Sequence, residues 1–130
     1  MVALAEKSVE KTIEIGMLYD FYGELLTPRQ KEVLQYYYEE NYSLSEIAEE
    51  LGVSRQAVHD TIHKAEKSLR TYEQKLGILE RFRVRGAQAE KASAAVDQMI
   101  CRLQTGDTLD RSELIQQLGT IRQMLGSLEE

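Results

Sequence analysis

Polar and basic residues between Ser54 and Arg70 recur at the spacing of one face of an α-helix. Arg and Gln side chains can form paired hydrogen bonds with the edges of guanine and adenine in the major groove of DNA, and Lys and Arg side chains bind phosphates. This face therefore predicts a nucleic-acid-binding helix, with base contacts near its start and phosphate contacts further along. The candidate base-contact residues are Ser54, Arg55, Gln56, His59 and His63, and the candidate phosphate-contact residues are Lys64, Lys67 and Arg70.

The helix that carries this face should follow another helix and a tight turn. Ser43 and Glu46 have the spacing of a capping box, which predicts a helix that starts at Leu44. Gly52 can adopt left-handed backbone angles and should end that helix, and Ser54 should cap the next one. The apolar residues of the two helices recur at helical spacings and predict their buried faces: Leu44, Ile47, Ala48 and Leu51 in the first, and Val58, Ile62, Ala65 and Leu69 in the second.

Two capped helices joined by a short turn predict a helix-turn-helix, in which the second helix enters the major groove. The alternative is an ordinary helical hairpin whose polar face is solvated. The two N-caps, the single Gly of the turn and the small Ala48 at a point of close packing favour the helix-turn-helix.

Two further helices are predicted upstream, over about Val9–Gly23 and Pro28–Glu40. Thr27 and Gln30 form a second capping box, and Pro28 stands at the first helical position, where its missing N–H costs nothing. We interpret the tyrosine run that follows mainly as core, with stacking of single-stranded bases as the alternative. The predicted inner residues are Ile13, Met17 or Leu18, Phe21 and Leu25 in the first helix, and Val33, Leu34, Tyr37 and Tyr38 in the second.

Charge is unevenly distributed along the chain. The whole chain has 16 basic and 22 acidic residues and a net charge of -6, whereas a free-standing DNA-binding protein more often carries a basic surface. Residues 1–53 sum to -7, residues 54–91 to +4 and residues 92–130 to -3. The positive charge is thus concentrated in the candidate binding helix and its continuation, although Asp60 lies on the same face.

The segment from Leu25 to Gly77 resembles a known family. Its sequence, LLTPRQKEVLQYYYEENYSLSEIAEELGVSRQAVHDTIHKAEKSLRTYEQKLG, is similar to the small YlxM proteins of Gram-positive bacteria, which are encoded beside the genes of the signal recognition particle GTPases. The similarity covers about Ile13 to Leu79. It implies an all-α, helix-turn-helix protein with a regulatory part in the signal recognition particle pathway.

The same helices are similar, more distantly, to the sigma factor region that reads the -35 element. The chain has no second segment suited to melting the -10 element or binding core polymerase, so we do not expect a complete sigma factor. The predicted fold is all-α: a sigma-region-4-like helix-turn-helix domain over residues 1–80 and an amphipathic helical extension over residues 81–130.

The extension contains two predicted amphipathic helices, separated by a break at Thr105–Asp107. Each helix has a regular stripe of apolar residues, here called its seam. We expect the two helices to form a homodimer interface, because apolar seams as regular as these seldom stay exposed. The alternative is a helical hairpin folded back on the N-terminal domain. The first seam comprises Ala89, Ala92, Val96, Met99 and Leu103, and the predicted dimerisation residues are Leu114, Leu118, Ile121, Leu125 and Leu128.

The sequence predicts no enzyme, cofactor or metal site. His59 and His63 have a spacing that can bind zinc, but no further ligands complete a set, and Cys101 has no base to activate it. The chain lacks a long apolar run and a basic, apolar leader, which predicts a cytoplasmic protein with no membrane partner.

Two functional hypotheses follow from the sequence. In the first, the protein is a nucleic-acid-binding regulator with DNA as the expected target and RNA as another possibility. In the second, it is a non-catalytic adaptor that binds the signal recognition particle, as protein or RNA, or polymerase. The basic helix favours the first and the acidic total favours the second.

Overall fold

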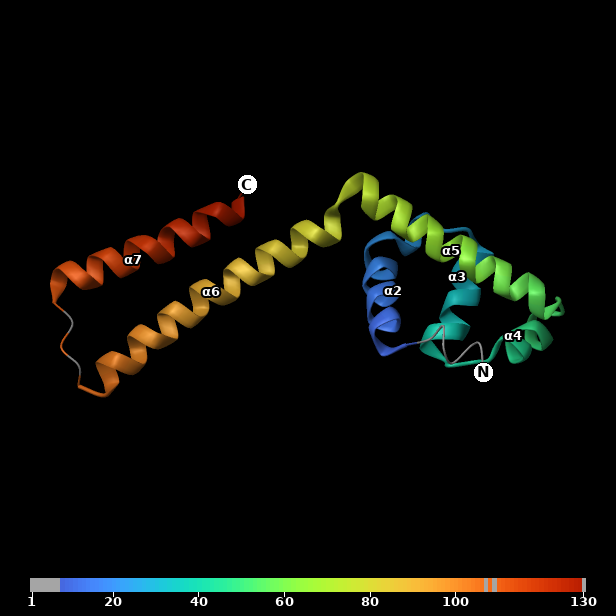
Figure 1. Ribbon diagram of the computed structural model, residues 1–130, viewed down its shortest axis with the longest axis horizontal. Coiled ribbons are helices and arrows are strands. Elements are labelled where there is room, and N and C mark those ends of the chain that lie inside the picture. Colours follow the sequence, from blue (N-terminus) through green and yellow to red (C-terminus); the bar gives the residue numbers. More distant parts are fainter. Residues whose placement is uncertain (1–7, 107, 109, 130) are drawn as a thin grey trace. The chain divides into compact units, whose positions relative to one another are not determined.

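The computed structural model describes residues 8–106, 108 and 110–129, apart from the Glu129 side chain. Every regular element among these residues is helical, which confirms the all-α fold class (Figure 1). The chain divides into two compact units, with the boundary between Leu79 and Glu80.

Four α-helices and two short helical segments make up the described part of the first unit. α2, α3 and α4 all contact α5, the long helix that runs past them in Figure 1. The elements are α2 (Val9–Tyr22), the 3-10 segment η1 (Gly23–Leu25), α3 (Pro28–Leu34), the π-helical segment η2 (Gln35–Glu39), α4 (Leu44–Leu51) and α5 (Arg55–Leu76).

The predicted helix starts are confirmed. In the first capping box the Thr27 N–H donates to Gln30 Oε1 at 3.1 Å, and the Gln30 N–H donates to Thr27 Oγ1 at 3.2 Å. Ser43 and Glu46 form the same reciprocal pair at 3.0 and 3.1 Å. Gly52 ends α4 with a φ of 67°, in the left-handed region that favours glycine. These local bonds fix where the chain enters and leaves α4.

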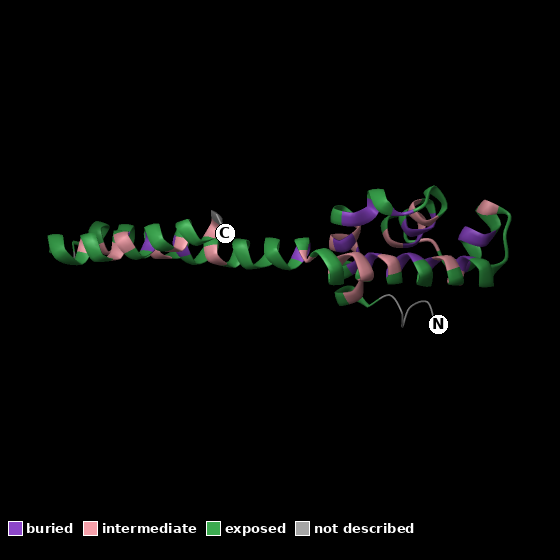
Figure 2. Ribbon diagram, turned by 90° about the horizontal axis from the view of Figure 1, so that it is seen from above, coloured by how far each residue is buried: buried purple, intermediate pink, exposed green. Residues whose placement is uncertain are grey.

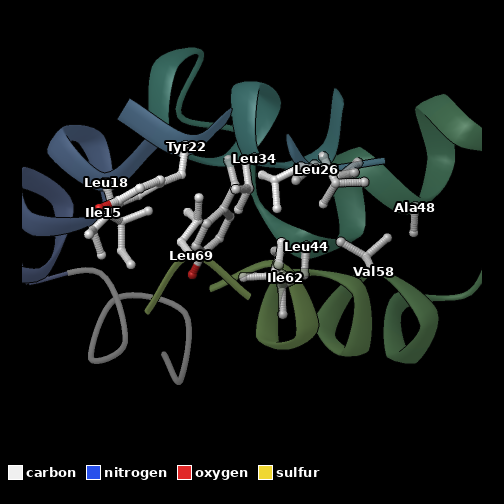
Figure 3. Packing of buried hydrophobic residues seen from close by; sticks show 14 of the residues in the cluster. Ile15, Leu18, Tyr22, Leu26, Leu34, Leu44, Ala48, Val58, Ile62 and Leu69 are labelled. Atoms are coloured by element: carbon white, nitrogen blue, oxygen red, sulfur yellow. The ribbon is translucent and has the colours of Figure 1, made fainter. Parts of the chain in front are cut away.

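The core of the first unit forms around one face of α5 (Figure 3). Burying each large apolar side chain of this kind contributes roughly 1.5–3 kcal/mol before the entropy cost of folding is counted. The predicted buried residues of α5, namely Val58, Ile62, Ala65 and Leu69, all lie in this core. The rest of the first unit contributes Ile15, Leu18, Tyr22, Leu26, Val33, Leu34, Tyr37, Leu44, Ile47, Ala48 and Leu79.

The prediction for the inner side of α2 was largely wrong. Ile13, Phe21 and Leu25 are 58%, 38% and 56% exposed, whereas Leu18, one of the two predicted alternatives, is buried. The buried face also carries Ile15 and Tyr22, and the Tyr22 hydroxyl bonds Glu73 of α5 and accepts the Ile78 N–H. α2 has apolar residues on two faces, and docking against α5 buries the face from which Tyr22 reaches Glu73 and Ile78.

The helix predicted over Pro28–Glu40 changes to a π-helical turn after Leu34. The three tyrosines of this turn have different surroundings. Tyr37 is buried, Tyr36 stacks on Tyr42 with ring centroids 5.0 Å apart, and Tyr38 donates a hydrogen bond to Glu66 at 3.0 Å. The tyrosine run thus serves packing, as the core interpretation predicted.

The second unit is a helical hairpin. α6 (Ile78–Gln104) follows the α5 cap residue Gly77, α7 (Arg111–Gly126) is capped by Asp110, and η3 spans Ser127–Glu129. The break predicted at Thr105–Asp107 is present as a turn at Thr105 and Gly106, whereas Asp107 lies outside the described residues. The two helices share a small core of Ala92, Met99 and Ile121, with Ala95, Leu114 and Met124 packed against it.

Replacing Gly52 should destabilise the first unit. Because Gly52 has a φ of 67°, Gly52→Ala should cost about 1–2 kcal/mol of unfolding free energy. Gly16 lies inside α2 with no atom within 4 Å of the place a Cβ would take, so Gly16→Ala should instead stabilise by about 0.5–1 kcal/mol. Urea unfolding followed by circular dichroism measures both changes; equal effects at the two sites would contradict the assigned backbone conformations.

Candidate nucleic-acid interface

The turn between α4 and α5 is held by backbone and side-chain hydrogen bonds. The Val53 N–H donates to the Ala48 carbonyl at 3.0 Å, and the Ala57 N–H donates to Ser54 Oγ at 3.0 Å. The Ser54 cap is confirmed, and α5 begins at Arg55. The Ser54 hydroxyl is therefore used within the helix, while the helix N-terminus remains exposed and favourable for anions.

The side of α5 opposite the core carries the predicted binding residues. Of these eight residues, seven are exposed and His59 is half-buried. Gln56 donates to Asp60 Oδ1 at 3.0 Å, so a bond to a base would require this contact to open. Arg70 Nε lies 3.4 Å from Glu14 Oε1 of α2, which partly neutralises it. The structure thus brings the predicted set onto one surface of one helix.

His59 and His63 form a contact pair on this surface. Their Nε2 atoms are 3.1 Å apart and their ring centroids 4.3 Å apart, so one ring can donate to the other. His59 Nδ1 also lies 3.7 Å from Asp60 Oδ1. No cluster of three or more potential metal ligands occurs in the part of the chain that the structure describes. Because the two Nε2 atoms contact each other and His59 Nδ1 is buried, a bond from His59 to a ligand would require this pair to open.

A basic groove runs beside this helix face, with a volume of about 520 Å³. Lys11 of α2 lines it together with residues of α5, and the sequence reasoning missed this lysine. Lys11 belongs to an acidic stretch of sequence, and only the docking of α2 on α5 places it here. The residues of α5 that line the groove are His63, Lys64, Glu66, Lys67, Arg70, Thr71 and Gln74.

A buried carboxylate lies under this groove. Glu66 is only 2% exposed, accepts a hydrogen bond from Tyr38 at 3.0 Å and pairs with Lys11 Nζ at 3.1 Å. Burial and the Glu66 carboxylate raise the pKa of the Tyr38 hydroxyl far above its ordinary value, so Tyr38 stays a hydrogen-bond donor. Glu66 fixes Lys11 at the groove and joins α2, η2 and α5.

Further basic residues follow α5 in the sequence and lie in the second unit. Arg81, Arg83, Arg85 and Lys91 are all exposed residues of α6, in the N-terminal part of that helix. In Figure 2 the exposed colour covers most of α6 and α7. Both units thus expose basic side chains to solvent.

Comparison with known proteins agrees with this architecture. The family UPF0122, described as "Putative helix-turn-helix protein, YlxM / p13 like", matches residues 9–105. The chain belongs to this family. The match includes α2 to α5 and the described length of α6, whereas α7 begins beyond its end.

Individual members of the UPF0122 family are also similar to this chain. A UPF0122 protein of Listeria welshimeri is 53% identical over 76 residues, which cover 58% of this chain and 69% of that protein. A UPF0122 protein of Halalkalibacterium halodurans is 40% identical over 108 residues, or 78% of this chain and 99% of that protein. The resemblance to YlxM proteins is therefore confirmed.

Among the described residues, no helix is long and apolar enough to cross a membrane.

Removing the Tyr38 hydroxyl tests the buried carboxylate. Tyr38→Phe leaves Glu66 short of one donor and should cost about 1–3 kcal/mol of unfolding free energy. The pKa of Tyr38 is higher in the folded than in the unfolded chain, so its contribution is complete below about pH 10 and declines as pH rises above that value. The free energy of unfolding, measured between neutral and alkaline pH, should fall less steeply with rising pH in Tyr38→Phe than in the wild type. An equal pH dependence in the two proteins would contradict this role of Tyr38.

Proposed function

We propose that this UPF0122 protein is a nucleic-acid-binding regulator that reads duplex DNA with α5. The observation that carries this proposal is the exposed polar and basic face of α5, which directly follows the capped turn after α4. In a helix-turn-helix, the residues at the start of the second helix meet base edges. Ser54, Arg55, Gln56, His59 and His63 would lie at the bases, with Lys64, Lys67 and Arg70 at the phosphates.

The basic groove extends the proposed contact beyond α5. Lys11 would add a phosphate contact from α2, close to Lys64 and Lys67. Asp60 on the same face would repel phosphates and reduce binding to unrelated sequences, because non-specific affinity comes mostly from the phosphates. The arrangement favours base reading over charge attraction alone.

The proposed setting is the cytoplasmic signal recognition particle pathway. The similarity to YlxM proteins supports it, because that family is encoded beside the genes of the particle's GTPases. The more distant similarity to the -35-reading region of sigma factors supports transcription as the regulated step. In this proposal the protein acts without catalysis and without a cofactor.

A second candidate is an adaptor that binds the particle's protein or RNA, or polymerase. The observation in its favour is the sum of -7 over residues 1–53, which opposes binding to a polyanion. Titration with duplex DNA, the particle's RNA and its GTPase over a series of salt concentrations distinguishes the candidates. Phosphate contacts must weaken steeply with salt. Salt-dependent binding to duplex DNA supports regulation by operator binding, and binding to the GTPase alone supports the adaptor.

We further propose that two copies pair through the second unit. Within the described residues its core holds only Ala92, Met99 and Ile121 as buried members. Large apolar side chains remain exposed on both helices, and a second hairpin could cover them in a four-helix bundle. Of the predicted dimerisation residues, Leu118 and Leu125 are exposed, Leu128 is half-buried, and Ile121 and the half-buried Leu114 belong to the hairpin's own core.

Two substitutions on α5 distinguish base reading from phosphate binding. Arg55→Ala should weaken binding to a duplex selected from a random pool by about 1–3 kcal/mol and leave unrelated duplexes unaffected. Lys67→Ala should weaken binding to all duplexes alike and lower the salt dependence by about one phosphate contact. Fluorescence anisotropy over a salt series measures both effects.

Both residues are exposed, so neither substitution should unfold the protein, and circular dichroism provides the control. If Arg55→Ala bound the selected and the unrelated duplexes as the wild type does, Arg55 would not read bases.

Charging the exposed side of the hairpin tests the dimer. Leu118 and Leu125 are 55% and 49% exposed, and Leu118→Glu with Leu125→Glu would place two carboxylates in the proposed interface. The double variant should lose several kcal/mol of association and sediment as a monomer. Ile121→Glu is the matched control, because it disrupts the hairpin core itself and should lower helix content. A wild type that is monomeric at micromolar concentration would exclude the dimer.

A further inference from the structure

α2 has a second apolar face that the core leaves uncovered. Val9, Ile13 and Phe21 of α2 are exposed on this face. Met17 lies between them, half-buried and packed against the core, and Leu25 continues the four-residue spacing in η1. Large apolar side chains exposed at helical spacing favour contact with another molecule.

A groove lies along part of this face, between α2 and the α3–η2 segment. Its volume is about 280 Å³. The Gln35 side chain of η2 donates to the Tyr19 hydroxyl of α2 at 3.1 Å and so links the two elements. The residues that matter for docking are Ile13, Gly16, Met17 and Asp20 of α2, with Tyr38 and Glu39 of η2.

Gly16 gives this groove a flat wall. A glycine inside a helix costs about 0.5–1 kcal/mol relative to alanine. No atom lies within 4 Å of the place its Cβ would take, so packing within the described part of the chain does not require glycine there. An absent side chain at this point allows the backbone of another molecule to come close to α2.

Charge indicates what kind of molecule fits. Asp20 and Glu39 line the groove from opposite elements, and none of its described lining residues is basic. A binding partner with an apolar side toward Ile13 and Met17 and basic side chains toward these two carboxylates is complementary to it.

We propose that this groove receives an amphipathic helix with basic flanks from a partner protein, which crosses α2 at Gly16. The apolar side chains of that helix contact Ile13 and Met17, and its Lys or Arg side chains pair with Asp20 and Glu39. The groove is lined by none of the proposed nucleic-acid-contact residues of α5. Protein docking through this groove is thus a function separate from nucleic-acid binding.

The test uses the full chain and a synthetic helical peptide that has Leu at helical spacing and Lys at the other positions. The same peptide with Glu in place of Lys is its control. The wild type should bind the Lys peptide and not the Glu peptide. Gly16→Phe fills the groove with a ring and should weaken binding about tenfold or more. Gly16→Ala adds only a methyl group at the close approach and should weaken binding by less.

Charge reversal provides a second, independent readout. The double variant Asp20→Lys with Glu39→Lys should no longer bind the Lys peptide and should bind the Glu peptide instead. DNA binding by Gly16→Phe should equal that of the wild type, which distinguishes this docking from the function of α5. Circular dichroism checks that every variant remains helical.

Three outcomes would overturn the proposal. The first is equal peptide binding by Gly16→Phe and the wild type. The second is a loss of self-association in Gly16→Phe by sedimentation, since a second copy would then occupy the groove. The third is a peptide that binds only after residues 1–7 are removed, since the chain's own start would then occupy the groove.

Discussion

The burial of one face of α5 is the constraint on which the first unit depends. α5 is 22 residues long, and α2, α3 and α4 all contact it. Its buried stripe, from Val58 to Leu69, supplies a contact surface for each of these helices. Because side chains on opposite sides of a helix diverge, the same packing holds the polar face of α5 toward solvent. Core and candidate interface are two sides of one helix.

Glu66 connects these two sides. A buried carboxylate is costly unless it is paired and hydrogen-bonded, and Glu66 has both Lys11 and Tyr38 as partners. The π-helical turn brings Tyr38 to this position, and docking of α2 brings Lys11. A change in either element would alter the basic groove, so the position of a surface lysine depends on a buried contact.

The second unit differs from the first in having only a small core. Its two helices bury few residues together, and their apolar side chains exceed what a single hairpin can cover. Small units with little core generally need a further partner or crosslink for stability. The family match ends at residue 105, before α7 begins.

The sequence by itself determined the features that depend on residues three or four positions apart. The capping boxes at Thr27 and Ser43, the Gly52 stop and the buried stripe of α5 were all predicted, because local hydrogen bonds and helical spacing define them. Their combination was also specific enough to reveal the UPF0122 resemblance.

Only the tertiary structure decided which face of α2 is buried. That helix has two apolar faces, and the choice depends on Tyr22 reaching Glu73 and Ile78, more than fifty residues away. The same holds for the π-helical turn and for Lys11, whose role depends on a carboxylate in another helix. Such contacts join segments that are distant in sequence, and local propensity carries no information about them.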